Sequence, residues 1–226
     1  MMGTTITPNN MIAITGFDPQ DFLSSDEKPA SIPETVAADL ASPSVVTQMP
    51  MLSSFTSTVA NQNADQLVGV YVPGLFALPV LQQPAGQGAY VSTEEETITQ
   101  FSLATKYQAI GLLAHNYLSG EEFFKLKPNQ YVILVFGDGS MDYYRISAAE
   151  SFQALTPNSP YSDFVDLADP AQTRLSSTQL FKRVYTTPNS VVFQTCIKAF
   201  GDPSWGRLFV TAEKVDVRQP VILAAN

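Results

Sequence analysis

The chain has 226 residues and a formal net charge of −9, with 12 Lys and Arg against 21 Asp and Glu. Such a balance leaves no basic surface for phosphates, which excludes nucleic acid as a partner. One cysteine and one histidine exclude an internal disulfide and the common structural zinc sites. No run reaches the roughly 18 apolar residues of a membrane span, and the N-terminus lacks a signal-peptide pattern. The protein is therefore either cytosolic or exported, with its export segment and membrane anchor absent from this chain.

Residues 1–64 are rich in Ser, Thr, Pro, Asn and Ala and show little periodicity. This composition predicts an extended or partly ordered N-terminal arm or linker. The amino-acid composition changes from Leu67 onward. Residues 68–81 carry β-branched and aromatic residues interrupted by Pro73 and Gly74, which favours two short strands around a bend. We therefore place a folded domain over residues 65–226.

Short runs typical of strands recur through this domain, and the sequence Gly137-Asp138-Gly139-Ser140 between two of them predicts a β-hairpin. Helical patterns are few: residues 120–126, and residues 175–185, where Ser176 and Gln179 have capping-box spacing. Many short strands with few helices favour a mainly β fold, a closed or nearly closed β-barrel. The expected strands are residues 102–107, 109–115, 131–137, 141–147, 190–196 and 207–215.

Three chemically capable residues lie at the ends of these strands. His115 ends one apolar run, Cys196 ends another, and Arg207 begins the run that follows. Gly201-Asp202-Pro203 between the last two is typical of a loop. If these two strands are antiparallel neighbours, Cys196 and Arg207 stand side by side at one end of the sheet.

Such a trio suits nucleophilic catalysis. A thiolate attacks a carbonyl carbon, an imidazole moves the proton, and a guanidinium stabilises the oxyanion that develops. Ordinary pKa values place about 1% of a Cys–His pair in the thiolate–imidazolium form, a fraction that nearby charges and hydrogen bonds can raise. Taken singly, each residue also has an ordinary structural reading: Cys196 in a buried strand, His115 in a satisfied contact, Arg207 at a solvated strand end.

Local motifs match a known family in composition and order, with His before Cys before Arg. They are Val72-Pro73, Leu78-Pro79-Val80, Ala114-His115 followed by Phe124 and Leu126, Phe193-Gln194-Thr195-Cys196, and Trp205-Gly206-Arg207-Leu208-Phe209-Val210. Residues 67–215 thereby resemble the sortases, the cysteine transpeptidases of bacterial cell surfaces. Papain-like and NlpC/P60-type peptidases place Cys before His, and L,D-transpeptidases carry a Ser-x-Gly-Cys signature that this chain lacks.

The resemblance implies a sortase-like barrel of about eight strands and a reaction that needs no cofactor or metal. Cys196 would form a thioester with the sorting signal of a surface protein, while His115 moves the proton and Arg207 holds the carbonyl oxygen. Ala114 and Thr195 would line the substrate site. The acceptor amine would come from a cell-wall precursor or a pilin-like lysine, at the extracellular face of a bacterial membrane.

The same resemblance places substrate specificity in residues 148–175 and 197–206. Three alternatives stay open: a cysteine hydrolase with the same triad, a non-catalytic surface module that kept the barrel, and a cytosolic binding protein. The acidity of the chain could suggest calcium dependence, but we interpret Asp163, Asp166 and Asp169 as a solvated loop face.

Overall fold

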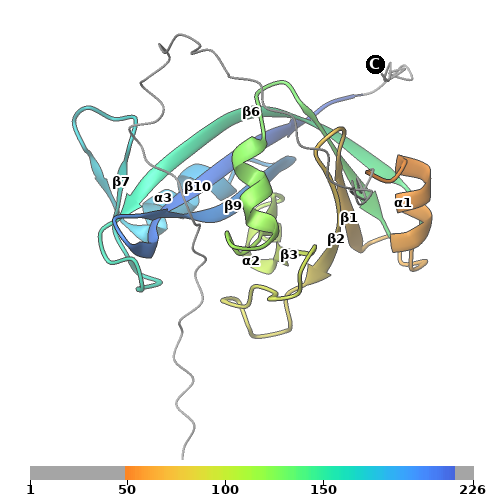
Figure 1. Ribbon diagram of the computed structural model, residues 1–226, viewed down its shortest axis with the longest axis horizontal. Coiled ribbons are helices and arrows are strands. Elements are labelled where there is room, and N and C mark those ends of the chain that lie inside the picture. Colours follow the sequence, from red (N-terminus) through yellow and green to blue (C-terminus); the bar gives the residue numbers. More distant parts are fainter. Residues whose placement is uncertain (1–48, 217–226) are drawn as a thin grey trace, which may run out of the picture.

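The computed structural model describes residues 49–216 and shows a closed β-barrel with short helices around it (Figure 1). Eight strands form the ring in the order β10-β9-β4-β3-β2-β1-β5-β6, and pairing of β10 with β6 closes it. The predicted mainly β, closed barrel of about eight strands is confirmed. The ring strands are β1 (Leu67–Val72), β2 (Phe76–Gln82), β3 (Ile98–Phe101), β4 (Ile110–Leu113), β5 (Tyr131–Phe136), β6 (Met141–Ala154), β9 (Ser190–Ala199) and β10 (Asp202–Lys214).

Two hairpins of the barrel form where the sequence predicts them. Gly74, with φ of 73°, lies between β1 and β2, and Gly139, with φ of 86°, lies between β5 and β6. Glycine adopts these positive φ values without the steric cost that a Cβ brings. Each turn lets an apolar strand pair at once with the next one, which builds the sheet from local contacts.

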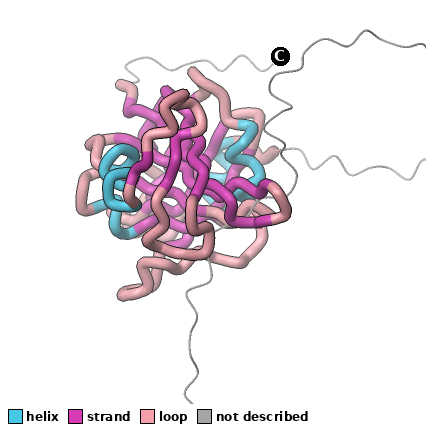
Figure 2. Tube along the Cα trace, turned by 90° about the vertical axis from the view of Figure 1, so that its left-hand side faces the viewer, coloured by secondary structure: helices cyan, strands magenta, loops and turns pink. Residues whose placement is uncertain are grey.

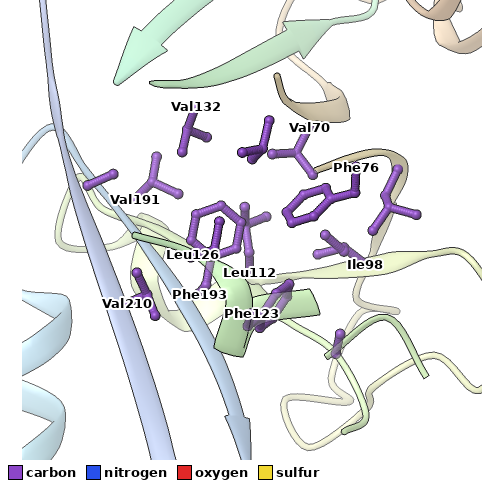
Figure 3. Close-up of a cluster of buried hydrophobic side chains, with 14 of the residues drawn as sticks. Val70, Phe76, Ile98, Leu112, Phe123, Leu126, Val132, Val191, Phe193 and Val210 are labelled. Carbon is purple, nitrogen blue, oxygen red and sulfur yellow. The ribbon is translucent and has the colours of Figure 1, made fainter. Parts of the chain in front are cut away.

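The barrel interior is filled by alternate residues of the strands, as the close-up in Figure 3 shows. Phe193 of β9 meets Phe123 edge to face, with ring centroids 5.1 Å apart. Phe123 comes from the 3-10 helix η2 (Ser119–Lys125), which occupies the region where a short helix was predicted. Burying each such ring stabilises the fold by about 1.5–3 kcal/mol. This packing holds β4 and β9, the strands that lead to the candidate site.

A second apolar cluster covers the outer face of β9 and β10. Val192 of β9 and Phe209 of β10 pack there against Leu180 and Tyr185 of α3 (Ser177–Tyr185). The predicted capping box is confirmed: the Gln179 amide donates to the Ser176 hydroxyl, and the Gln179 side chain accepts from the Ser176 amide. Figure 2 shows the barrel turned by 90° from Figure 1, with strands through the middle and helices at the periphery.

Two expectations from the sequence were wrong in detail. Residues 102–105 form the short helix α2 (Ser102–Thr105) rather than a strand. The Gln83 side chain accepts from the Ser102 amide at the point where β3 ends. The segment 148–175 is not one long connection, because β6 runs on to Ala154 along β10. Two further short strands follow it: β7 (Phe164–Asp166) and β8 (Arg174–Leu175).

Helix α1 (Leu52–Val59) packs on the barrel, at the opposite end of the molecule from β7 and α3 (Figure 1). Phe55 is buried against Val68 of β1 and Val135 of β5. The ordered body therefore begins before the domain boundary predicted at residues 64 and 65. Residues 1–48 of the expected arm lie outside the described residues, so their part of that expectation stays a prediction.

Candidate active site

Cys196 and Arg207 are partners on adjacent antiparallel strands, as the sequence predicted. Their Cα atoms face each other across the β9–β10 pair, so both side chains project from the same face of the sheet. Both are fully buried, with exposed fractions of 0% and 1%. The pairing of β9 with β10 thus places the guanidinium beside the thiol.

His115 lies just beyond the end of β4, which runs parallel to β9. Leu113 of β4 is the partner of Gln194, two residues before Cys196, so the chain beyond β4 runs beside the cysteine. The Asn116 side chain confirms the proximity, because its Nδ2 donates to the main-chain oxygen of Cys196 at 3.4 Å. The structure therefore brings His115 close to the Cys196–Arg207 pair. This pair lies within the strands and not at their ends, where the sequence had predicted it, because β9 runs on to Ala199 and β10 already begins at Asp202.

The Arg207 guanidinium is held by main-chain oxygens. Nη1 donates to Ser204 and Gly206 at 2.8 Å each, and Nη2 donates to Pro157 at 3.1 Å. Among residues 49–216, no carboxylate forms a salt bridge with Arg207. These bonds set the orientation of the guanidinium, and a cation held in this way can stabilise an anion that develops beside it.

Burial dominates the acidity of Cys196. Loss of water around the sulfur raises the pKa of the thiol to about 12. The charge of Arg207 and a hydrogen bond from its side chain lower this pKa, and the charge of Asp202 raises it. In this arrangement Cys196 is a neutral thiol at physiological pH, and the neighbouring Arg207 favours its charged form.

His115 is also buried, with 2% of its surface exposed. Burial lowers the pKa of the imidazole, and a hydrogen bond to the Val91 main chain opposes that shift. Nε2 has no hydrogen-bond partner among the described residues, so Nδ1 is the nitrogen that donates to Val91. The neutral ring therefore carries its proton on Nδ1 and keeps Nε2 as a basic atom. Tyr117 stacks on the ring at 5.1 Å.

Ala114 and Thr195, which the resemblance placed at the substrate site, are both buried. The Thr195 hydroxyl donates to the Ala114 carbonyl at 3.0 Å. Because side chains alternate along a strand, Thr195 projects to the opposite face of β9 from Cys196. This contact ties the end of β4 to β9, and a substrate-binding role for the two residues stays a prediction.

A cavity of about 480 Å³ lies on the outer face of the sheet beside the candidate site, with Arg207 in its wall. Gln194 forms part of that wall and accepts a hydrogen bond from the Tyr185 hydroxyl at 2.6 Å. Most of the other lining residues are apolar and come from segments far apart in the sequence, so no local motif reveals the cavity. They include Val91, Phe101, Phe164, Phe181 and Phe209.

Acidic residues form no metal site in the described part of the chain: no group of three or more His, Cys, Asp or Glu is arranged to hold an ion there. Asp163 pairs with Arg174, and Asp166 pairs with Arg183. Asp169 accepts from main-chain amides of its own loop. None of the helices within residues 49–216 is long and apolar enough to cross a membrane.

Comparison with solved structures finds sortases, whereas comparison by sequence finds no match. No family model matches this chain, and no curated protein does. Sortase A from Corynebacterium diphtheriae is 16% identical, with a TM-score of 0.46. The match covers 69% of this chain and 63% of the sortase A chain, which is less than two thirds of its length. Sortase C from Clostridium perfringens is 14% identical (TM-score 0.42; 73% and 83% covered). Sortase C-1 from Actinomyces oris is also 14% identical (TM-score 0.44; 80% and 90% covered).

Proposed function

We propose that this protein is a cysteine transpeptidase of the sortase type, with Cys196 as nucleophile, His115 as proton carrier and Arg207 as oxyanion donor. The observation that carries the proposal is the pairing of Arg207 with Cys196 across β9 and β10. A buried arginine that faces a thiol and has no carboxylate partner among residues 49–216 is an unusual arrangement for a purely structural pair, because an unneutralised buried charge is costly. The motif order of His, Cys and Arg supports the same reading.

The chemistry follows from these three groups. His115 Nε2 takes the thiol proton, and Cys196 Sγ attacks the carbonyl carbon of a peptide bond. Arg207 stabilises the negative oxygen that forms. As the C–N bond breaks, the imidazolium gives its proton to the leaving amine, and a thioester remains. An acceptor amine then attacks the thioester, loses a proton to His115, and displaces the Cys196 thiolate.

The cavity beside Arg207 supports a peptide substrate. Its mostly apolar walls suit the side chains of a peptide on the N-terminal side of the scissile bond. Gln194 and Arg207 supply polar atoms that can bind main-chain carbonyls of that peptide. The substrate in this proposal is the sorting signal of a surface protein. The acceptor is a cell-wall precursor or a pilin-like lysine, and the reaction takes place at a bacterial cell surface.

Incubation with a peptide library, with and without an added amine, tests the proposal. Mass spectrometry should find cleaved peptides joined to the amine, and Cys196→Ala should form neither ligated nor cleaved product. Hydrolysis products alone, unchanged by any amine, would instead identify a hydrolase with the same triad. Absence of both products from a protein whose thiol reacts with iodoacetamide would favour the non-catalytic module.

A further inference from the structure

The connection between β2 and β3, residues 83–97 (yellow in Figure 1), runs to the candidate site because of the strand directions. β2 and β3 are parallel, so their connection has to travel back along the sheet before β3 begins. β3 is antiparallel to β4, with Thr99 opposite Leu113. The last residues of the connection therefore lie at the same end of the barrel as His115.

Val91 of this connection covers the cysteine. Its side chain is buried in a small apolar cluster with Leu113 and Cys196, and Phe101 packs against that cluster. None of the Cys196 surface is exposed. A thiol that has to reach the carbonyl carbon of a peptide cannot do so while this cluster is intact, so the covering residue has to move.

The same residue also holds the histidine, since the Val91 main chain receives the hydrogen bond from His115. One position of the connection thus contacts both the nucleophile and the base. Movement of Val91 would uncover the thiol and release Nδ1 of the imidazole together.

Side chains, rather than strand pairing, hold the connection down. Gln83 Nε2 donates to the main-chain oxygens of Gly88 and Tyr90, at 3.1 and 2.8 Å. Gln83 Oε1 in turn accepts from the main chain and hydroxyl of Ser102, both at 2.9 Å. Nearer β3, the Ser92 amide donates to the Thr99 hydroxyl at 2.8 Å. A segment with so few main-chain bonds can open without unfolding the barrel.

We propose that residues 83–97 form a lid with Val91 as its latch, and that the structure shows the closed state, in which Cys196 is shielded from substrate. The proposal rests on the proposed function in one respect, namely that an incoming peptide is what opening admits. The closed lid makes the site inert in two ways, by blocking access and by removing water from the thiol and the imidazole. Opening hydrates both groups, which favours their charged forms.

Alkylation of the thiol by iodoacetamide measures lid opening directly, because Cys196 is the sole cysteine of the chain. At low urea, labelling through lid opening should depend weakly on urea, because opening exposes little surface. If labelling depends on urea as steeply as global unfolding does, at low as well as at high urea, the lid proposal is wrong. Neither outcome involves a peptide, so the lid and the transpeptidase can fail separately.

Gln83→Ala should speed labelling in the absence of urea by roughly tenfold, because the lid loses the two hydrogen bonds that anchor it to Ser102. Gln82→Ala is the matched control: its side chain donates to the Leu67 carbonyl at 2.8 Å, on the preceding residue but outside the lid. Val91→Ala, which keeps the main-chain oxygen and shortens the cover, should also label faster than wild type. Equal labelling rates in Gln83→Ala, Val91→Ala and Gln82→Ala would contradict the proposal.

Discussion

Arg207 combines a structural task with the chemical task that the proposed reaction gives it. Its Nη atoms hold the carbonyls of Ser204, Gly206 and Pro157, and its charge acts on the thiol of Cys196. The planar guanidinium can do both at once, because its five donors point in fixed directions. A lysine ammonium keeps the charge but lacks the planar arrangement of donors. A substitution of Arg207 by lysine therefore separates the two tasks.

Arg207→Lys should therefore fold but acylate slowly. We expect the acylation rate to fall by about 100-fold, the effect typical of losing one oxyanion donor. The acylation rate is measured by mass spectrometry, with a peptide that the wild-type protein cleaves in the library experiment. The melting temperature is measured on the same samples. Arg145→Lys is the control, since that arginine contacts Tyr131 on an exposed part of β5 and β6. Wild-type acylation by folded Arg207→Lys would remove Arg207 from the chemistry.

The acidity of Cys196 predicts how stability changes with pH. Folding raises the pKa of the thiol from 9.0 to about 12, so the unfolded chain loses this proton first as the pH rises. The contribution of the neutral thiol is complete below pH 9 and is lost progressively between pH 9 and pH 12. At one pH unit above the unfolded pKa, the loss amounts to about 1 kcal/mol.

Urea unfolding at pH 7 and pH 10 checks this prediction. The free energy of unfolding of wild type should fall by about 1 kcal/mol more than that of Cys196→Ala over the same interval. Lysines and tyrosines titrate alike in the two proteins, so the difference isolates the thiol. Equal falls would show that the thiol is not shielded from water in the folded state.

At the scale of elements, the sequence predicted features that depend on neighbouring residues. It did not predict features that depend on pairing between residues far apart in the chain. The turns at Gly74 and Gly139 and the capping box of α3 depend on a few adjacent residues, so the sequence reveals them. The end of β6 depends on its pairing with β10, where Gln153 lies opposite Gly206, and no local pattern records that. For the same reason the Cys196–Arg207 pair, joined by a short connection, was predictable, whereas the cover by Val91 was not.

The capping box of α3 gives a prediction at this scale. Ser176→Ala should lower the free energy of unfolding by about 1 kcal/mol, because an amide at the helix start loses its acceptor. Thr178→Ala, at an exposed position of the same turn, is the control and should leave stability nearly unchanged. Urea unfolding measures both variants, and equal effects would show that the cap contributes nothing specific.

On the scale of the whole molecule, the barrel has its candidate site on β9 and β10 and its helix α1 on a different part of the ring. Phe55 of α1 fills a cluster with Val68 and Val135 and has no contact with Cys196 among the apolar clusters. Stability and chemistry should therefore be separable, because residues without shared partners act independently.

Phe55→Ala should lower the free energy of unfolding by about 3–5 kcal/mol, the usual cost of emptying a buried phenylalanine site. The labelling rate of Cys196 without urea should stay within a few fold of wild type. Ser57→Ala on the exposed side of α1 is the control for the helix itself. A change in unfolding free energy no larger than that of Ser57→Ala would show that α1 is not part of the folded body.

The central claim is that His115, Cys196 and Arg207 act together on a peptide carbonyl, and trapping the acyl-enzyme tests it most directly. Wild type incubated with a peptide library and quenched in acid should carry an acyl group on Cys196 that hydroxylamine removes, as expected of a thioester. Folded His115→Ala should accumulate this adduct at least ~100-fold more slowly, since general acid–base catalysis contributes 100-fold or more. An adduct that forms equally fast on His115→Ala, or no adduct on a wild-type protein whose thiol is accessible to iodoacetamide, would contradict the account.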